Sequence, residues 1–245
     1  MCGRFALAAS PEQLARQFEL PLADVPTLKP RYNIAPTQPV AVVRVGPRAT
    51  REREIGITQW GLVPEWAKDI SIGSRMINAR AETLAEKPSF RAAFKRRRCI
   101  IPALGFYEWR TTADKKKQPY FIHPRESAAD TPALFAFAGL WEIWFSEDGS
   151  EVQTCTIITT EANRIMSGLH HRMPVILPPE KYAGWLDPNV DDPRALRSFL
   201  KPYDSERMQY YPVDRKVNTP RNDDAGCIEP ISESPTLFAD SGAHE

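Results

Sequence analysis

Short apolar runs separated by polar turns dominate this chain, and several of them alternate between apolar and polar positions. That period of two predicts β-strands. The expected strands are 39–45, 54–60, 99–102, 106–110, 120–123, 134–144, 152–160, 173–177 and 209–213. Asp114-Lys115 and Asp148-Gly149 supply turn residues between neighbouring strands, so we expect hairpins there and mostly antiparallel pairing.

Helical spacing is confined to short segments. Ser10, Pro11 and Gln13 form a typical helix start ahead of Leu14 and Phe18. Shorter helices are expected near 89–94, with Ser89 as cap, and at 162–168, 180–186 and 193–200. The pattern therefore predicts an α+β fold: one domain, 1–230, of mostly antiparallel, barrel-like β-sheets with peripheral helices. The polar, acidic residues 231–245 are expected to be a disordered tail.

Composition narrows the class further. The 245 residues are enough for a large core, no apolar run has the length of a membrane span, and the start lacks signal-peptide features, so we expect a cytoplasmic protein. The four cysteines form no CxxC pair, which argues against a zinc ribbon or a disulfide scaffold. Cys99 and Cys155 lie in apolar strands and are expected in the core.

The net charge of +1 conceals a basic middle. Residues 75–125 contain thirteen Lys and Arg against four acidic residues, whereas everything after Cys227 has four acids and no Lys or Arg. A basic segment is a candidate footprint for a nucleic-acid backbone. The alternative is a solvated face, because 95–98 leads directly into an apolar strand and 115–117 lies in a hairpin turn.

Cys2 follows the initiator directly, so removal of Met1 would leave one residue with a free α-amine and a thiol. Such an aminothiol can form a Schiff base with an aldehyde through its nitrogen and then close a thiazolidine ring through its sulfur. Both groups titrate near neutral pH, so both nucleophiles are available. The alternative is that the position of Cys2 is an accident of the start site.

Four short segments place polar residues within otherwise apolar sequence: 31–36, 77–80, 105–109 and 169–174. Glu108 stands among aromatic residues, and it is either a buried carboxylate with a raised pKa, suited to proton transfer, or a solvent-facing strand residue. His170 and His171 diverge too much as neighbours to form a metal pair, so we predict no metal and assign one histidine to proton transfer, with Arg172 as a phosphate anchor. Trp66, beside a turn, offers a face for a base to stack on.

Six motifs occur in one order: MCGRF (1–5), RYNIAP (31–36), WGLVPEW (60–66), INARAET (77–83), GFYEW (105–109) and HHRMP (170–174). Together they resemble the SRAP family, the SOS response-associated peptidases, over nearly the whole chain. Two positions depart from the family pattern. Ala67 stands where many relatives have a second aromatic residue, and His171 stands where the family often has Asp.

The resemblance implies a protein that binds single-stranded DNA and captures abasic sites through a thiazolidine on Cys2, with no cofactor, most simply as a nucleoid-associated monomer. By motif, Asn33 would help to position the sugar and Cys2, Glu108 would manage protons at the amine and imine, and His170 would assist opening of the deoxyribose ring. The DNA-binding residues implied in the same way are Arg4, Pro36, Trp66, Asn78, Arg80, Thr159 and Arg172.

Two other functions remain open from the sequence. One is a peptidase in which Cys2 acts as an N-terminal nucleophile, including on Met1. The other is a noncovalent reader of modified DNA bases, which needs the basic middle but not the aminothiol.

Overall fold

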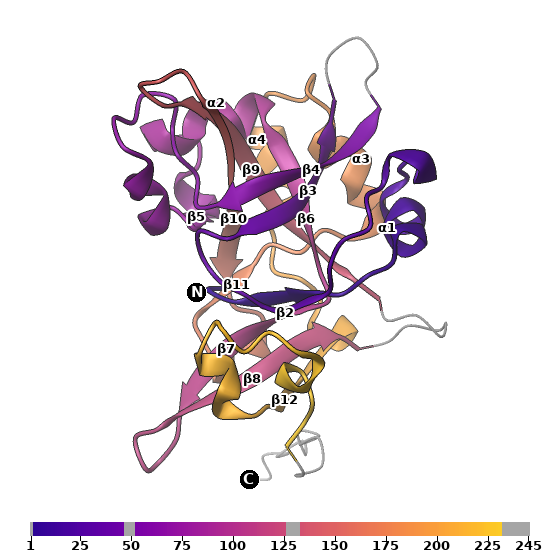
Figure 1. Cartoon of the computed structure of the whole chain (residues 1–245), viewed down its shortest axis with the longest axis vertical. Coiled ribbons are helices and arrows are strands. Elements are labelled where there is room, and N and C mark those ends of the chain that lie inside the picture. The colour runs from indigo at the N-terminus through magenta and orange to yellow at the C-terminus, as the bar shows by residue number, and fades with distance from the viewer. Residues whose placement is uncertain (1, 47–51, 126–132, 232–245) are drawn as a thin grey trace, which may run out of the picture.

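The computed structural model describes residues 2–46, 52–125 and 133–231. These residues form two β-sheets stacked along the longest axis of the molecule (Figure 1). The predicted tail lies outside the described residues except for Ile231, so its disorder and the domain boundary at 230 stay predictions. Within the described ranges, no helix is long and apolar enough to cross a membrane.

The larger sheet closes on itself through five strands. β3 (Pro39–Val45) pairs antiparallel with β4 (Arg53–Trp60) and with β6 (Arg98–Ala103). β6 continues to β9 (Phe135–Phe145), and β9 to β10 (Glu151–Glu161), both antiparallel. β10 then pairs parallel with β4 and completes the ring. The expected barrel-like, mostly antiparallel arrangement is confirmed, and this parallel closure is the feature that the alternation pattern did not predict.

The far end of β10 extends beyond the barrel and carries two short strands. β5 (Asn78–Arg80) pairs parallel with it, and β11 (Arg172–Pro174) pairs antiparallel. Both pairings include Thr159 of β10. Segments almost a hundred residues apart in sequence are thereby brought to one place.

The second sheet inserts the start of the chain between later strands. Its order is β12 (Met208–Pro212), β8 (Lys117–Pro124), β7 (Gly105–Thr111), β1 (Phe5–Leu7) and β2 (Arg31–Ile34), with every pairing antiparallel. In Figure 1 the N-terminus lies between this sheet and the barrel above it. The sequence pattern did not predict β1, β2 or β5, because three or four residues are too few to show alternation.

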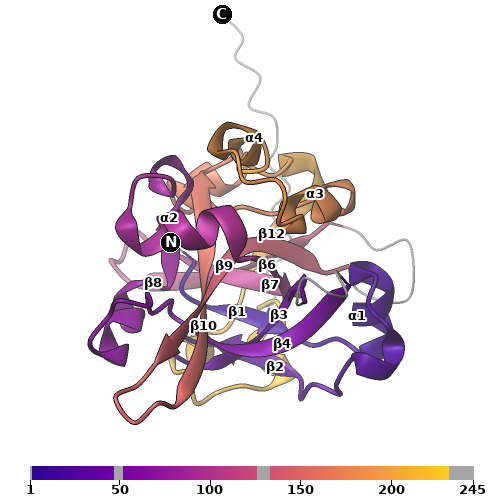
Figure 2. The same ribbon diagram turned by 90° about the horizontal axis from the view of Figure 1, so that it is seen from above.

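In the part of the chain that the structure describes, four short α-helices lie around the outside of the sheets (Figure 2). α1 (Pro11–Phe18) is capped by Ser10, which accepts a hydrogen bond from the Gln13 backbone, as predicted. α2 (Pro88–Arg96) has Pro88 as its first residue and Lys87 at the cap, so the assignment of Ser89 as cap was wrong. α3 (Tyr182–Leu186) and α4 (Pro193–Arg197) fall in the two later predicted segments.

The helix expected at 162–168 is not formed, and only the 3₁₀ turn Met166–Gly168 is present. The Asn163 side chain accepts from the backbone N–H of Met166 and donates to the carbonyl of Tyr203, so it caps a single turn instead of extending a helix. The other 3₁₀ turns are Leu22–Asp24, Ile70–Arg75, Ala81–Thr83, Pro179–Lys181, Ser205–Arg207, Arg215–Asn218 and Ala225–Cys227.

Aromatic residues join the two sheets into one core. The ring of Phe5 in β1 lies 5.2 Å from that of Trp60 in β4 and 6.0 Å from that of Phe137 in β9, both edge to face. Phe106 of β7 lies 5.8 Å from the same Phe137 ring. Because β1 is anchored against the barrel at Phe5, the residues just before it have a fixed position.

Candidate active site at the chain start

Cys2 lies immediately before β1 at the junction of the two sheets and is 1% exposed. Its carbonyl accepts a hydrogen bond of 2.8 Å from the Asn78 side chain of β5, which ties the chain start to the barrel sheet. Its Sγ lies 4.0 Å from the carbonyl oxygen of Arg4. Burial raises the pKa of the Cys2 thiol, and the nearby Glu108 carboxylate raises it further, so the thiol is protonated at neutral pH in the chain that retains Met1.

Glu108 is a buried carboxylate, which decides between the two interpretations that its sequence context left open. It lies on β7 and is 4% exposed, and burial raises its pKa. β1 pairs with β7 at Gly105 and Phe106, and the backbone N–H of Tyr107 donates to the carbonyl of Arg4 at 2.9 Å, so Glu108 follows directly after the backbone contacts with the chain start. A carboxyl group with a raised pKa can exchange a proton with an amine or imine close to neutral pH.

His170 approaches Glu108 from the barrel side. Its Nδ1 lies 3.9 Å from Glu108 Oε1 and accepts a hydrogen bond of 2.9 Å from the backbone N–H of Arg172. A ring nitrogen that accepts this bond carries no proton, so the neutral ring holds its proton on Nε2. Burial lowers the pKa of His170, and the His171 ring stacked at 4.3 Å lowers it further. His170 is therefore neutral at pH 7.

A pocket of about 460 Å³ opens beside this pair. Two cationic side chains, Arg4 and Lys117, line it. Lys117 lowers the pKa of Glu108 and so opposes the effect of burial on that pKa. The lining residues are Arg4, Glu108, Trp109, Lys117, His170 and Asn218. The pocket combines a carboxyl group, an imidazole and two positive charges within one concave surface.

Asn33 is placed differently from the expectation. It is fully buried, and its side-chain N–H groups face the carbonyls of Val217, Thr219 and Asn222 at 3.1, 3.1 and 2.6 Å. Its Oδ1 accepts a 2.6 Å hydrogen bond from Arg4. Asn33 thus holds Arg4 and the closing segment 215–223 in place, and the direct contact with Cys2 comes from Asn78 instead.

The closing segment is fixed by a second group of contacts. Asp223 accepts hydrogen bonds from the backbone N–H groups of Tyr32 and Asn33 at 2.6 and 2.8 Å, and it pairs with the Arg31 guanidinium. The motif at 31–36 is therefore mainly a docking point for the end of the domain. Arg4, held by Asn33 and by the Val217 carbonyl, is presented to the pocket by this arrangement.

Arg172 and Thr159 lie close to His170, and both side chains are already engaged. Arg172 forms two hydrogen bonds to Glu82, of 2.7 and 3.0 Å, and one of 2.6 Å to the carbonyl of Thr159. Thr159 is fully buried, and its Oγ1 lies 3.4 Å from the carbonyl oxygen of Ala79. Their assignment to phosphate and DNA stays a prediction, which for Arg172 requires that the anion compete with Glu82.

The remaining candidates lie nearer the surface. Arg80 is exposed at the end of β5, Pro36 is half-buried, and Trp66 is 59% exposed. Ala67, the departure from the family pattern, is buried, and its carbonyl accepts a hydrogen bond of 2.7 Å from Trp144. The backbone that presents Trp66 is therefore anchored, although Ala67 itself supplies no second aromatic ring beside it.

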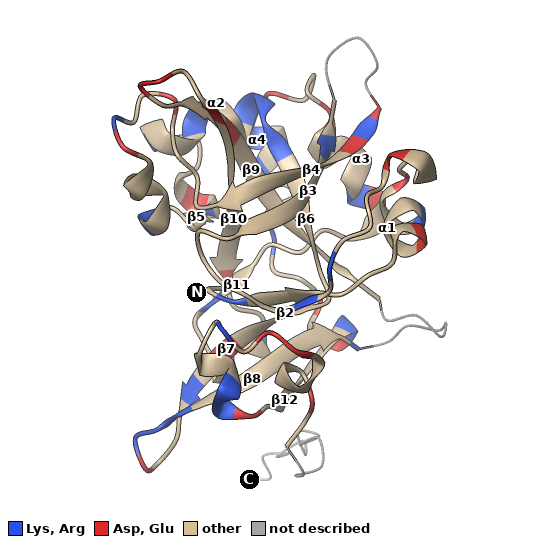
Figure 3. Cartoon of the chain, in the orientation of Figure 1, with Lys and Arg blue, Asp and Glu red and all other residues tan. Residues whose placement is uncertain are grey.

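The basic middle of the sequence does not form one continuous surface. Figure 3 places the cations of α2 and those of the β7–β8 hairpin at opposite ends of the molecule. Arg98 is buried and donates to the carbonyls of Phe94, Trp185 and Asp187, while Arg97 pairs with Glu142 at 2.6 Å. The segment therefore does not form one DNA footprint; Lys117 is its member that lines the pocket, together with Arg4 from the chain start.

Trp109, Asn218, Lys117 and Glu82 are site residues that the sequence analysis did not single out. The guanidinium carbon of Arg4 lies 5.9 Å from the centroid of the Trp109 ring. The indole N–H of Trp109 donates a hydrogen bond of 2.7 Å to the side-chain oxygen of Asn218. Trp109 belongs to a recognised motif and was open to prediction. Asn218 could not be predicted from the sequence, because it reaches the pocket only when the segment 215–223 packs against the first residues of the chain. In the described ranges, no group of three or more His, Cys, Asp or Glu side chains forms a metal site.

The described residues form an α+β domain whose start is buried between a β-barrel and a second sheet, beside a Glu–His pair. The chain belongs to the SRAP family: the model described as SOS response associated peptidase (SRAP) matches residues 1–220. The resemblance inferred from the motifs is confirmed.

Named relatives support the same assignment. Abasic site processing protein YoqW of Bacillus subtilis is 45% identical over 234 residues, which cover 94% of this chain and 99% of that protein. Abasic site processing protein HMCES of Gallus gallus is 34% identical over 227 residues, covering 83% and 67%. A crystal structure of a protein from Bacteroides thetaiotaomicron superposes with a TM-score of 0.80 at 28% identity, covering 94% of this chain and 100% of that one.

Proposed function

We propose that this protein processes abasic sites in DNA and captures them covalently through the α-amine and thiol of Cys2 after Met1 has been removed. The observation that carries the proposal is the position of Cys2, held by Asn78 at the junction of the sheets and close enough to Glu108 for the carboxylate to affect its thiol. The names of the relatives, which are abasic site processing proteins, supply the substrate class.

The first step joins the amine to the sugar. The ring-opened form of an abasic deoxyribose carries an aldehyde at C1′, and the free amine of Cys2 adds to this carbon. Loss of one water from the resulting carbinolamine gives the Schiff base. Glu108, with its raised pKa, is suited to take a proton from the attacking amine and to return it to the departing hydroxyl. His170, neutral with its proton on Nε2, is suited to protonate the ring oxygen as the sugar opens.

The second step closes the ring. The Cys2 sulfur attacks the imine carbon, the thiol proton moves to the nitrogen, and a five-membered thiazolidine results. The overall reaction releases one water and needs no oxidant, metal or cofactor. Because the thiol pKa is raised, its proton must be removed as the sulfur attacks, and Glu108 is the nearby carboxylate that can accept it.

The DNA is expected to bind as a single strand. Trp66, 59% exposed, offers a stacking face, and Arg4 and Lys117 supply positive charge at the pocket itself. An abasic sugar in a single strand has no partner base to hold it in a helix. Entry of such a sugar into a pocket of about 460 Å³ therefore avoids the cost of unpairing a duplex.

The test mixes the purified mature protein with a single-stranded oligonucleotide that carries one abasic site. A complex that survives denaturation is expected for the wild type and not for Cys2→Ala. The matched control is an oligonucleotide with a tetrahydrofuran at the same position, which has the sugar shape but no aldehyde. It should bind without forming an adduct. A wild-type protein that forms no stable complex with the abasic oligonucleotide would refute the proposal.

The family description also names a peptidase, and the same site is suited to removal of Met1 by the chain itself. In this second role Cys2 is the nucleophile or the residue after the cleaved bond, and Glu108 is the proton acceptor. Intact mass measurement of Glu108→Gln separates self-processing from removal by a host enzyme. Retention of Met1 in the variant supports self-processing, and its absence contradicts it.

A further inference from the structure

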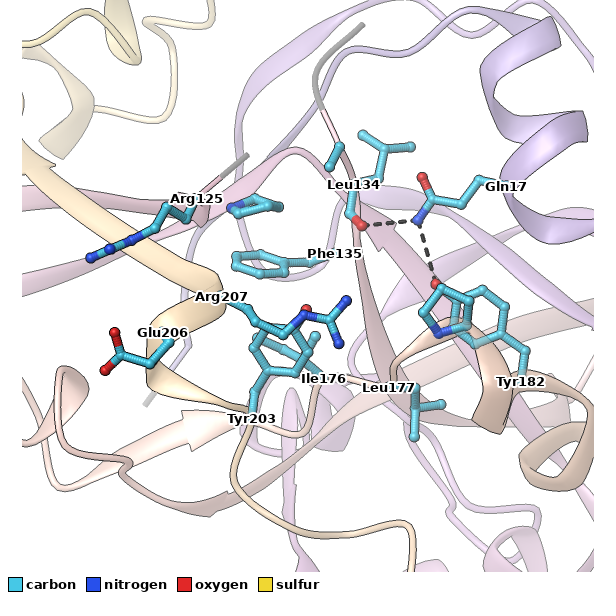
Figure 4. Close-up of a pocket in the computed structure, with 13 residues that line it drawn as sticks. Gln17, Arg125, Leu134, Phe135, Ile176, Leu177, Tyr182, Tyr203, Glu206 and Arg207 are labelled. Carbon is cyan, nitrogen blue, oxygen red and sulfur yellow. Dashed lines mark hydrogen bonds between the residues drawn. The ribbon is translucent and has the colours of Figure 1, made fainter. Parts of the chain in front are cut away.

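Strand β8 runs between two pockets of the molecule. Its last residue, Pro124, lines a pocket of about 410 Å³ (Figure 4). Phe135 and Tyr182, which also line that pocket, are buried, so its walls belong to the core. The first residue of β8, Lys117, is exposed and lines the other pocket, beside Glu108. Lys117 therefore places an accessible positive charge at the site of the proposed chemistry.

Backbone pairing fixes the position of Lys117. It lies opposite Thr111, the last residue of β7, so the hairpin that presents Lys117 is the one that carries Glu108. The turn of this hairpin is closed by Thr112, whose backbone N–H and hydroxyl both donate to the Lys116 carbonyl at 2.8 Å. Of the three consecutive lysines in the hairpin, Lys117 is the one that lines the pocket.

Within the described residues, Lys117 forms no ion pair with an acidic side chain. The nearest acid in the sequence is Asp114, in the hairpin turn. Its carboxylate pairs with Lys116 at 3.0 Å and accepts a hydrogen bond from the Thr112 hydroxyl. Asp114 is thus occupied by other partners, and the ammonium group of Lys117 is available to an anion from solution.

Other cations of the site are committed to protein groups. Arg4 donates to Asn33 at 2.6 Å, and Arg172 forms two hydrogen bonds to Glu82, of 2.7 and 3.0 Å. An incoming phosphate would have to share or displace these partners. Lys117 requires no such exchange, so it is the pocket cation best placed to take up a phosphate of the substrate.

The chemistry of the substrate brings a phosphate to this pocket. In the proposed reaction the abasic sugar lies beside Cys2, Glu108 and His170, and the sugar carries one phosphate through C3′ and another through C5′. Both phosphates are only a few bonds from the carbon that reacts. Lys117 lies close enough to Glu108 to lower its pKa, and its side chain is long and flexible. An ammonium group binds phosphate as a point charge, so it does not require the fixed geometry of a guanidinium.

We propose that Lys117 binds one of the two phosphates that flank the abasic sugar and thereby holds the sugar in the pocket beside Cys2. The inference rests on the proposed function and adds to it a substrate contact that the sequence motifs did not imply. Because the contact is local, the charge of Lys117 matters for one phosphate position and not for the strand as a whole.

The experiment measures binding of a single-stranded oligonucleotide that carries a tetrahydrofuran in place of the abasic sugar, by fluorescence anisotropy. This analogue has no aldehyde, so its binding does not depend on the covalent step. Lys117→Gln, at an exposed position, should fold and should weaken binding about tenfold, as expected for loss of a hydrogen bond to a charged group. The slope of log K against log salt should fall in magnitude by about 0.7, the value for one phosphate contact on a single strand.

The matched control is Lys115→Gln. It removes the same charge from the same hairpin, at an exposed position that does not line the pocket. This variant should change neither the affinity nor the salt dependence appreciably. An equal loss of affinity in the two variants would show a general effect of charge and would overturn the inference.

Methylphosphonate linkages locate the contact, because each removes the charge of one phosphate. At one of the two positions that flank the tetrahydrofuran, the neutral linkage should weaken binding by the wild type about tenfold and should cause no further loss in Lys117→Gln. Equal sensitivity of the two proteins at both flanking positions refutes the role of Lys117. Capture of abasic DNA by the wild type is measured separately, and its absence refutes the proposed function instead.

Discussion

Replacement of Asn33 by alanine tests whether this residue supports the site through structure or through chemistry. The substitution removes the donor that faces the Val217, Thr219 and Asn222 carbonyls and the acceptor for Arg4. All of these contacts are inside the protein, since Asn33 is fully buried. After the change, the hydrogen bonds from Asp223 to the backbone of Tyr32 and Asn33 still join the closing segment to β2, but the side-chain contacts of residue 33 are lost.

The size of the effect follows from these contacts. Two neutral hydrogen bonds are worth about 1 kcal/mol each, and the bond to the Arg4 guanidinium about 2 kcal/mol. Water that enters the vacated space will restore part of this, so we expect a loss of about 3 kcal/mol in the free energy of unfolding. For a domain of this length that corresponds to a fall of about 6 to 12 °C in Tm.

The assay combines thermal unfolding by circular dichroism with the rate of adduct formation, measured at a temperature where the variant is folded. Asn33→Ala should melt early and yet form the adduct faster than Asn78→Ala, because Asn78 contacts Cys2 directly. Asn189→Ala, at an exposed position, is the control and should change neither quantity appreciably. If Asn33→Ala melts like the wild type but forms no adduct, the structural role assigned to Asn33 is wrong.

Three further predictions concern the pocket and its surroundings. Glu108→Gln should slow adduct formation at pH 7. The same variant should have a higher Tm than the wild type at pH 7. Because the pKa of Glu108 is raised in the folded state, the contribution of its protonated carboxyl group to the free energy of unfolding is fully present below pH 4.5 and is lost as the pH rises. The two proteins should therefore melt alike near pH 4, and a lower Tm of the variant at pH 7 would contradict the raised pKa. Glu82→Gln should release Arg172 from its ion pair and tighten binding of a single-stranded oligonucleotide in a fluorescence anisotropy titration, whereas weaker binding would argue against Arg172 as a phosphate anchor. Trp66→Ala should leave Tm unchanged and weaken the same binding by about 1 to 3 kcal/mol, and unaltered affinity would exclude base stacking on Trp66.

The long strands of the barrel were predictable because their alternation extends over seven or more residues. The short strands that build the site were not, since β1, β2 and β5 contain only three or four residues and owe their conformation to partners far away in sequence. The pairing of β5 and β11 with the end of β10 is a tertiary event, and it decides which polar residues meet.

The site itself was predictable in its chemistry and not in all its contacts. Burial of Glu108 was one of the two interpretations that its aromatic neighbours left open, and the chemistry of Cys2 was inferred from its place in the chain. The contacts of Asn33 and Arg172 did not follow, because their partners are the closing segment and Glu82. Arg98 shows the same limit: its four-residue basic run is typical of an exposed surface, yet its guanidinium is buried among backbone carbonyls.

The central claim is that the mature amino terminus at Cys2 is the group that bonds to the abasic sugar. The direct measurement is mass spectrometry of the peptide that carries the DNA remnant, after digestion of the stable complex with a protease and a nuclease. The account predicts a remnant on the peptide that begins at Cys2, with Met1 absent and one water lost relative to the two reactants. A remnant on any other residue, or on a peptide that still contains Met1, would contradict it.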